Sequence, residues 1–358
     1  MGPSHSATKI RNKSETTKKK RKNTAQVLVF LKNLCNFAAV ELIHRLKYHL
    51  VAFVVVAIWG STFVFTKMLL QSGLSPAQIF TLRFIIAYVL LSGWTAYRAW
   101  SRGDHVSHLS SFISRLFCNS WRDELLMVGL GLTGGSLYFL TENAAMLYTT
   151  ATNTSLIVCS CPLFAMFLFA LFYRQSERIS RTQAAGSLVA CLGMAMVVLN
   201  GHYVLHLSPL GDLLAFGACL CWAAYSLLMK SALERYPALF ITRKVFFYGL
   251  VTIIPYYICF PDEASPSIFQ FFNYSILLNL LFLGVVASML CFLLWNWVIG
   301  KLGAVVATNW VYFNPITTIL FAWWLLSEQI TVWFLLGSAL ILLGMYLADR
   351  KKQAARVT

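Results

Sequence analysis

The stretch ATNTSLIVCSCP at residues 151–162 has a counterpart in AVVATNWVYFNP at residues 304–315. Each stretch ends on a proline inside an apolar segment, and the two prolines, Pro162 and Pro315, are 153 positions apart. Each is then followed by a Ser-Glu turn and two glycines: Ser176, Glu177, Gly186 and Gly193 in the first copy, and Ser327, Glu328, Gly337 and Gly344 in the second. A repeat period this long in so apolar a chain predicts two structural halves rather than a solenoid.

The composition excludes a soluble fold. Of the 358 residues, 58% are hydrophobic and 12% are charged, whereas about 25% are charged in typical soluble proteins. A chain of this size cannot hide so much apolar surface from water, so we predict an all-α membrane protein whose main partner is the lipid bilayer. The net charge of +16 is typical of nucleic-acid binders. The basic residues, however, flank apolar segments or lie in one N-terminal run, which indicates membrane orientation and no nucleic-acid partner.

Ten apolar segments of nearly the length that crosses a bilayer predict ten transmembrane helices. Their approximate spans are 50–70, 77–97, 124–146, 151–172, 182–200, 211–231, 240–260, 276–297, 304–325 and 332–349. We therefore predict four parts: a basic arm with an interfacial amphipathic helix at 1–48, five-helix repeats at 49–200 and 201–350, and a basic tail at 351–358. A start site upstream of the native protein is the alternative explanation of residues 1–48.

Lysine and arginine set the predicted orientation. The loops at about 71–76, 147–150, 201–210, 261–275 and 326–331 contain neither residue. Because cytoplasmic loops carry the excess of basic residues, these five loops are predicted to lie outside and both termini in the cytoplasm. The chain is accordingly predicted to be a multi-pass protein of the inner or plasma membrane.

The early parts of the two halves also match. Trp59 and Trp222 are 163 positions apart, as are Lys67 and Lys230, and Asn143 and Asn296 are 153 apart. Because each half has five spans, an odd number, the second half enters the membrane upside down. Inverted repeats of this kind are the architecture of alternating-access transporters, which bind substrate between the halves. In that reading Pro162 and Pro315 kink the helices that shape the cavity.

Three ionisable residues lie within predicted spans, closer to the outer end of each span: Lys67, Arg83 and Glu142. At that depth an ionisable group costs several kcal/mol unless it is paired or hydrated. One explanation is a structural ion pair plus a lysine that reaches the interface. The other is a hydrated site at the outer gate that contacts a charged substrate. Other candidate pathway residues are the polar and aromatic side chains Trp59, Asn143, Trp222, Tyr225, Asn296 and Tyr312.

The sequence holds no pattern typical of a catalytic, metal or cofactor site. The nine cysteines include no CxxC pair and fit no metal-ligand spacing. Metalloprotease, serine-hydrolase and Walker motifs are absent too, so neither an enzyme nor a cofactor is predicted. The glycine-rich run at residues 129–135 is reminiscent of a phosphate-binding loop, but it lies inside an apolar span. There, glycines predict close helix packing.

The doubled pattern resembles the drug/metabolite transporter superfamily, and within it the EamA-domain group of ten-helix permeases, over about residues 50–349. The resemblance implies a central cavity between two inverted bundles, formed largely by helices one, three, four, six, eight and nine. It also implies export or exchange of small metabolites. One departure is that Glu142 matches Trp295 in the repeat, so the charged cluster is not symmetric. The matching features are Trp59-Gly60-Ser61 with Lys67, Arg83-Phe84, Pro162 with Ser176-Glu177, Trp222-Ala223-Ala224-Tyr225 with Lys230, Pro315 with Ser327-Glu328, and Gly186, Gly193, Gly337 and Gly344.

We therefore expect a secondary transporter of a small metabolite such as an amino acid, working by alternating access between two inverted repeats. The alternative is a membrane scaffold or sensor that does not transport and that uses the arm at 1–48 to bind a partner or lipid. The identity of the substrate, the coupling ion, the direction of transport and the oligomeric state have no signature in the sequence.

Overall fold

The computed structural model describes residues 46–101, 117–149, 151–173, 180–199, 208–261, 273–326 and 332–354. Within these ranges the regular elements are all helical, as predicted. The chain divides into two compact units, residues 1–50 and 51–358. The predicted arm and most of its interfacial helix, both Ser-Glu turns and the last four residues lie outside the described ranges.

Seven helices of the described part are long and apolar enough to cross a membrane. They are Leu46–Gln71, Pro76–Arg98, Trp121–Tyr148, Pro209–Leu233, Ala238–Cys259, Tyr274–Leu302 and Ala304–Phe321. Shorter apolar helices occur at Cys161–Phe172 and Leu335–Ala348. The predicted spans at 151–172, 182–200 and 332–349 fall on helices that are interrupted, shorter or less apolar. The predicted total of ten spans therefore remains a prediction.

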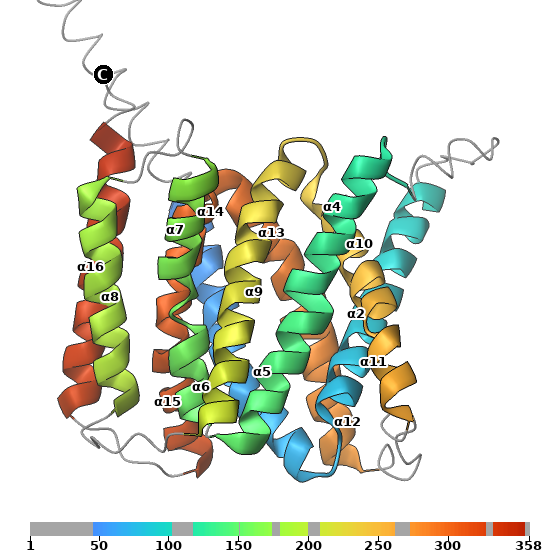
Figure 1. Cartoon of the computed structure of the whole chain (residues 1–358), viewed down its shortest axis with the longest axis horizontal. Helices are drawn as coiled ribbons and strands as arrows, with labels where there is room; N and C mark the ends of the chain where they lie inside the picture. The colour runs from blue at the N-terminus through green and yellow to red at the C-terminus, as the bar shows by residue number, and fades with distance from the viewer. Residues whose placement is uncertain are drawn as a thin grey trace, which may run out of the picture. The chain divides into compact units, whose positions relative to one another are not determined.

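Several long helices contain a break or a wider turn, so they carry more than one label in Figure 1. After the first helix, the elements of the first half are α2 (Pro76–Ser101), α4 (Trp121–Gly131), η1 (Leu132–Ser136), α5 (Leu137–Tyr148), α6 (Ala151–Val158), α7 (Cys161–Phe172) and α8 (Arg181–Leu199). Those of the second half are α9 (Pro209–Leu233), α10 (Ala238–Thr252), α11 (Ile254–Cys259), α12 (Tyr274–Leu281), η4 (Phe282–Leu290), α13 (Cys291–Leu302), α14 (Ala304–Asn309), η5 (Trp310–Phe313), α15 (Asn314–Leu326) and α16 (Val332–Ala354).

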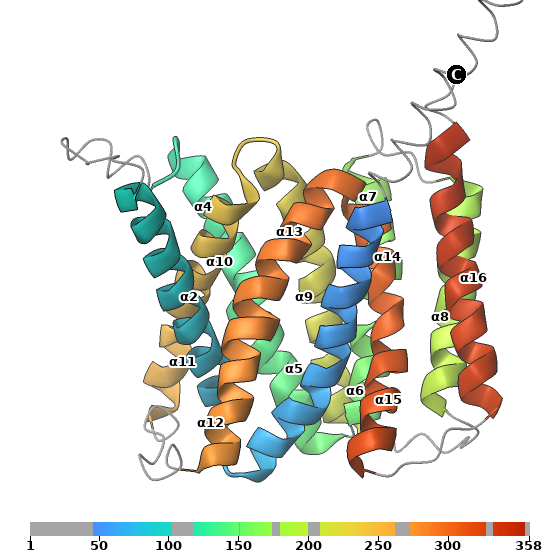
Figure 2. The same ribbon diagram turned by 180° about the vertical axis from the view of Figure 1, so that it is seen from behind.

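The repeated glycines hold α8 against α16, which lie side by side in Figures 1 and 2. A Cβ atom at Gly186 would lie 2.6 Å from the carbonyl oxygen of Gly344, and a Cβ at Gly193 would lie 2.7 Å from that of Gly337. Each glycine of the first copy thus packs on a glycine of the second, in antiparallel order. Only residues without a side chain let two helix backbones approach so closely in a membrane.

Both prolines lie where a helix restarts. Helix α6 ends at Val158 and α7 begins at Cys161, directly before Pro162. In the second half, the 3₁₀ turn η5 separates α14 from α15, which begins directly before Pro315. Proline lacks an N–H group and clashes with the preceding turn, so a continuous helix is disfavoured at these positions.

Two π-helical segments occupy matching positions in the two halves. Segment η1 covers Leu132–Ser136 and contains Gly135 with non-helical dihedral angles (φ −129°, ψ −107°). A shift of 153 positions carries it into η4, at Phe282–Leu290. Glycine here permits close packing, as predicted: a Cβ at Gly134 would lie 2.3 Å from the Tyr225 ring. Segments of this kind are frequent at functional sites.

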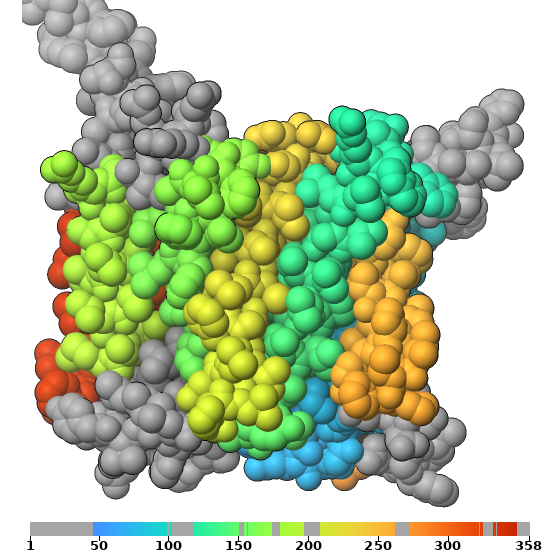
Figure 3. Space-filling model, in the orientation of Figure 1, coloured from blue at the N-terminus to red at the C-terminus, as the bar shows by residue number. Residues whose placement is uncertain are grey.

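The outward faces of the helices carry large apolar side chains. Figure 3 shows the outer face formed by α8, α7, α9, the α4–α5 run and α10–α11. Its helices expose Leu188 and Leu192 on α8, Leu213 on α9, and Ile258 on α11. Soluble proteins do not expose apolar surface on this scale, whereas lipid tails cover it without cost.

Candidate functional site

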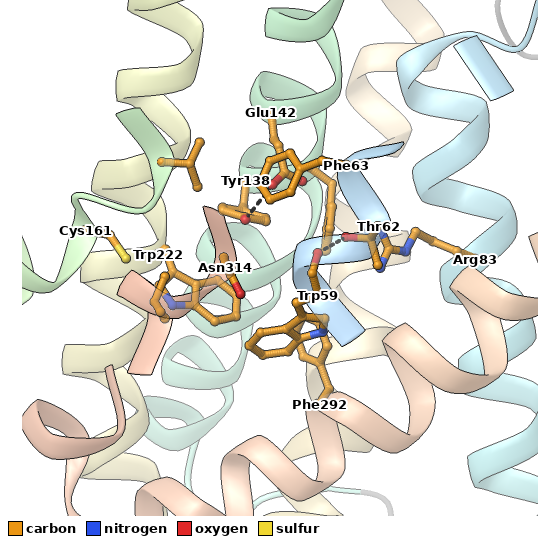
Figure 4. Close-up of a pocket in the computed structure, with 13 residues that line it drawn as sticks. Trp59, Thr62, Phe63, Arg83, Tyr138, Glu142, Cys161, Trp222, Phe292 and Asn314 are labelled. Atoms are coloured by element: carbon orange, nitrogen blue, oxygen red, sulfur yellow. Dashed lines mark hydrogen bonds between the residues drawn. The ribbon is translucent and has the colours of Figure 1, made fainter. Parts of the chain in front are cut away.

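A cavity of about 30 Å³ lies among the helices of the second unit (Figure 4). Its walls come from the first helix and from α2, α5, α6, α7, α9, α13, η5 and α15. The lining residues are Trp59, Thr62, Phe63, Arg83, Tyr138, Phe139, Glu142, Val158, Cys161, Trp222, Phe292, Val311 and Asn314. Two of these side chains carry opposite charges, and many of the others are aromatic.

The two charged side chains form no ion pair with each other. Arg83 is 2% exposed; its Nε donates to Ser288 Oγ at 2.8 Å, and its guanidinium lies 4.3 Å from the centre of the Phe139 ring. Glu142 is 7% exposed and accepts one hydrogen bond, from Tyr138 Oη to Oε1 at 2.8 Å. In the described part of the chain, Glu142 Oε2 and the terminal guanidinium nitrogens of Arg83 have no polar partner. A buried charge without a polar partner needs a counter-charge or water.

Aromatic rings form another part of the wall. The Trp59 ring lies 5.2 Å from Trp222 and 5.6 Å from Phe292, in edge-to-face arrangements. Trp59 Nε1 donates to the carbonyl of Ala287, inside η4, at 2.9 Å. By contrast, Trp222 Nε1 and Asn314 Oδ1 are buried without a hydrogen-bond partner among the described residues. The wall therefore offers an unused donor and an unused acceptor beside an apolar surface.

Four of the predicted pathway residues, Trp59, Arg83, Glu142 and Trp222, line the cavity together. Two more lie directly behind its wall. Tyr225 donates from its hydroxyl to Asn296 Oδ1 at 2.6 Å, and Asn296 Nδ2 donates to Thr242 Oγ1 at 2.8 Å. Tyr225 and Asn296 are both fully buried.

The other predicted residues lie outside the lining. Lys67 Nζ donates to the carbonyl of Met146 at 2.6 Å, in the last turn of α5, where a cation complements the helix dipole. Asn143 Nδ2 donates to the carbonyl of Pro76 at 3.1 Å, and Tyr312 is fully buried. Pro162 and Pro315 directly follow lining residues, Cys161 and Asn314.

The sequence alone did not single out the apolar lining residues. An apolar side chain inside a membrane span looks the same whether it faces a cavity or a neighbouring helix. The repeat holds the signal that could have found them, because lining residues occur in matched pairs. Phe139 and Phe292 are 153 positions apart, as are Val158 and Val311, and Cys161 and Asn314.

Comparison with known proteins places the chain in a family. The profile of the EamA-like transporter family matches residues 46–199 and 209–348, which together are most of the sequence. The chain belongs to the EamA-like transporter family. It is thus a multi-pass membrane protein of a transporter family, and the resemblance to the drug/metabolite transporter superfamily is confirmed.

Similar proteins align with most of the sequence. An "uncharacterized transporter" of Archaeoglobus fulgidus is 26% identical over 308 residues, covering 86% of this chain and 98% of its own length. A "probable amino-acid metabolite efflux pump" of Salmonella typhimurium is 25% identical over 320 residues, covering 86% and 97%. A solved crystal structure aligns with a TM-score of 0.63 at 20% identity, covering 86% of this chain and 99% of its own. At that identity the match supports the fold alone.

Proposed function

We propose that this EamA-family protein is a secondary transporter that exports or exchanges a small zwitterionic metabolite, such as an amino acid. It works by alternating access between two inverted five-helix repeats. In this proposal it lies in the inner or plasma membrane with both termini in the cytoplasm. The alternative of a scaffold that does not transport depends on residues 1–48, of which the structure describes only 46–48.

The observation that carries the proposal is the presence of Arg83 and Glu142 in one cavity without an ion pair. Each charge loses hydration when it is buried, and a partner of opposite sign offsets that loss. A zwitterion supplies both partners at once. Its carboxylate would accept from the guanidinium of Arg83, and its ammonium would donate to Glu142 Oε2. The apolar part of the ligand would then lie against Trp59, Trp222 and Phe292.

The names of similar proteins support the same substrate class. Beside the Salmonella protein, a protein of Streptantibioticus cattleyicolor described as a "probable terminal-alkyne amino-acid exporter" is 26% identical over 234 residues, covering 65% of this chain and 76% of its own length. An amino-acid substrate agrees with the two opposite charges in the cavity.

The small size of the cavity supports alternating access. About 30 Å³ has room for about two water molecules, since one needs at least about 10–15 Å³. An amino acid can enter only if the helices around the cavity separate. The interruptions before Pro162 and Pro315 would let the halves of these helices move independently. Lys67 joins the first helix to the end of α5 and would therefore act at the gate rather than on the substrate.

Two measurements on the purified protein test this proposal. Thermal unfolding in detergent is recorded with amino acids, nucleosides, sugar phosphates and organic cations, because a ligand of the folded state raises its stability. For each amino acid, the methyl ester and the N-acetyl derivative remove one charge at a time. We expect stabilisation by one or more free amino acids and by neither derivative. Flux of the same compound is then followed in proteoliposomes.

Matched variants localise the effect. Arg83→Ala and Glu142→Gln are expected to abolish both the thermal shift and the flux while the protein still inserts and purifies. Arg98→Ala, on the exposed end of α2, and Glu234→Gln, on an exposed turn, are expected to behave as wild type. Unchanged transport in Arg83→Ala would rule out its proposed role. A protein that binds and moves none of the compounds would favour the scaffold alternative.

A further inference from the structure

Two matched pairs around the cavity combine a smaller polar residue of the first half with a larger aromatic residue of the second half. Thr62 and Tyr225 are 163 positions apart, like the lining pair Trp59 and Trp222. Glu142 and Trp295 are 153 positions apart, like the lining pair Phe139 and Phe292. In both of these pairs, the member from the first half lines the cavity. The member from the second half is a larger aromatic side chain that is fully buried outside the lining. Two other pairs have the opposite order of size, because Phe63 and Tyr138 line the cavity and their matches, Ser226 and Cys291, are smaller.

Tyr225 fills a space that Thr62 leaves open in the other half. The Tyr225 ring lies against Gly134 of η1 and 5.1 Å from the Trp222 ring, and its hydroxyl donates to Asn296. Thr62 bonds only the carbonyl of Trp59, in its own helix. Asn143 matches Asn296 in the repeat, and its Oδ1 is buried without a partner.

Trp295 is held by packing alone. Its ring centre lies 5.1 Å from that of Trp59 and 6.4 Å from that of Trp222. Its indole N–H is buried without a hydrogen-bond partner in the described part of the chain. A side chain without a directional bond can change rotamer without breaking one, which suits a moving element better than a fixed support.

The two aromatic residues lie toward one end of the bundle. In Figures 1 and 2, α9 and α13 run toward the end where α4 begins, so Tyr225 and Trp295, about one turn past the lining residues Trp222 and Phe292, lie on that side of them. The first helix and α5, which carry Thr62 and Glu142, run toward the opposite end. At the end where α4 begins, Lys244, the match of Arg83, is bonded to both oxygens of Glu124 at 2.8 and 2.9 Å. Two further aromatic rings thus lie beyond the lining on the side where α4 begins.

We propose that Tyr225 and Trp295 form a plug that closes the substrate pathway toward the end where α4 begins. This inference rests on the proposed transport function and adds the device that makes access one-sided. To open this end, the Tyr225 ring must leave Gly134 and break its bond to Asn296. Trp295 must also turn away from Trp59. Thr62, the match of Tyr225, bonds within its own helix, so opening the other end breaks no equivalent bond.

Thiol labelling tests the plug without any substrate. Cys161 lines the cavity and is fully buried, so its alkylation reports access to the cavity. The full chain, with an epitope after residue 358 to report orientation, is placed in sealed membrane vesicles of either orientation. A membrane-impermeant maleimide is then added outside, and peptide mass spectrometry measures modification of Cys161 separately from the other cysteines. Helix α16 ends at the same end as α4 begins (Figure 1), so the epitope marks the plugged face.

We expect Cys161 of the wild type to be protected from the plugged face. Tyr225→Thr copies the first-half residue and should raise the labelling rate from that face about tenfold, which corresponds to about 1.4 kcal/mol of closure free energy. Tyr225→Phe keeps the ring and should stay close to wild type. Tyr346→Thr, an exposed tyrosine on α16, is the matched control and should change nothing. Thermal unfolding verifies that each variant is folded.

Three results would overturn the plug. Cys161 of the wild type could be labelled equally fast from both faces, the rate in folded Tyr225→Thr could equal that of wild type, or Tyr225→Phe could open the cavity as far as Tyr225→Thr. None of these readings depends on a transported compound. A protein that moves no amino acid would contradict the proposed function and would still report whether this end is closed by Tyr225.

Discussion

Arg83 and Lys244 stand at matching positions of the two halves, 161 positions apart, and they have opposite surroundings. Lys244 Nζ donates to both carboxylate oxygens of Glu124. Arg83 donates to the neutral hydroxyl of Ser288 and lies on an aromatic ring. The charge of Lys244 is therefore satisfied inside the protein, whereas Arg83 has no ionic partner in the described part of the chain. In the proposed function, it is the bonding partner of a buried cation, rather than its position in the repeat, that separates a structural role from a ligand-binding one.

The cluster around Glu124 explains why its end of the bundle is firmly held. Tyr248 donates to Glu124 at 2.6 Å, as does the backbone N–H of Cys118. The neighbouring Asp123 accepts from Tyr236 at 2.9 Å and pairs with Arg235. Burial raises the pKa of Tyr236 to about 12, so the phenol stays a protonated donor at neutral pH. These bonds tie residues 117–120, α4 and α10 together.

The largest effect that we expect from this comparison is on stability. Lys244→Ala leaves the buried carboxylate of Glu124 without its cation, and breaking a buried pair on one side costs about 3–5 kcal/mol. Arg83→Ala removes a cation without an ionic partner and one hydrogen bond to a charged group, so it should cost less, about 1.5–3 kcal/mol. Thermal unfolding of the detergent-solubilised variants compares the two. Equal destabilisation of both variants would contradict the division into a structural and a functional cation.

The repeat is visible in the sequence, and several residues predicted from the sequence line the cavity. Pro162 and Pro315 were placed at helix interruptions by residue type alone, since proline disfavours a continuous helix wherever it occurs. The glycine pairs were visible as a pattern, but their mutual contact depends on how α8 and α16 pack across the two halves. The Glu124–Lys244 pair was missed for the same reason. Glu124 begins an apolar segment, where an acidic residue is an ordinary surface or helix-capping residue.

The position of the cavity depends on differences between the halves that a repeat search ignores. Aligning the copies reveals that Thr62 matches Tyr225, but only packing reveals that the smaller side chain leaves space beside Arg83 and Glu142. Lys67 illustrates the converse. Its charge inside a span was compatible with a lysine that reaches the interface and with a site at the outer gate, and its ammonium group binds a carbonyl at the end of α5.

An intermediate effect is expected on ligand binding when the difference between the halves is removed. Thr62→Tyr places a phenol ring in a cavity of about 30 Å³, so affinity for the stabilising amino acid should fall at least about tenfold. Because neighbours must shift, it should also cost about 1–3 kcal/mol of stability. Thr62→Val has nearly the same volume as threonine and is the control, with affinity expected to be unchanged. Wild-type affinity in folded Thr62→Tyr would place the ligand elsewhere.

The smallest effect concerns Ser288, which orients Arg83 from η4 at 2.8 Å. Ser288→Ala removes one hydrogen bond to a charged group, which contributes about 1.5 kcal/mol or more. The guanidinium of Arg83 still contacts Phe139 and should therefore keep part of its orientation. We therefore expect affinity for the amino acid to fall about fivefold, or about 1 kcal/mol. Ser92→Ala removes a buried hydroxyl that has no partner and should leave affinity unchanged. The loss in Ser288→Ala should be confined to ligands that carry a carboxylate, because Arg83 binds that group. An equal loss for the corresponding amine would show that Ser288 supports the fold of the cavity rather than the orientation of Arg83.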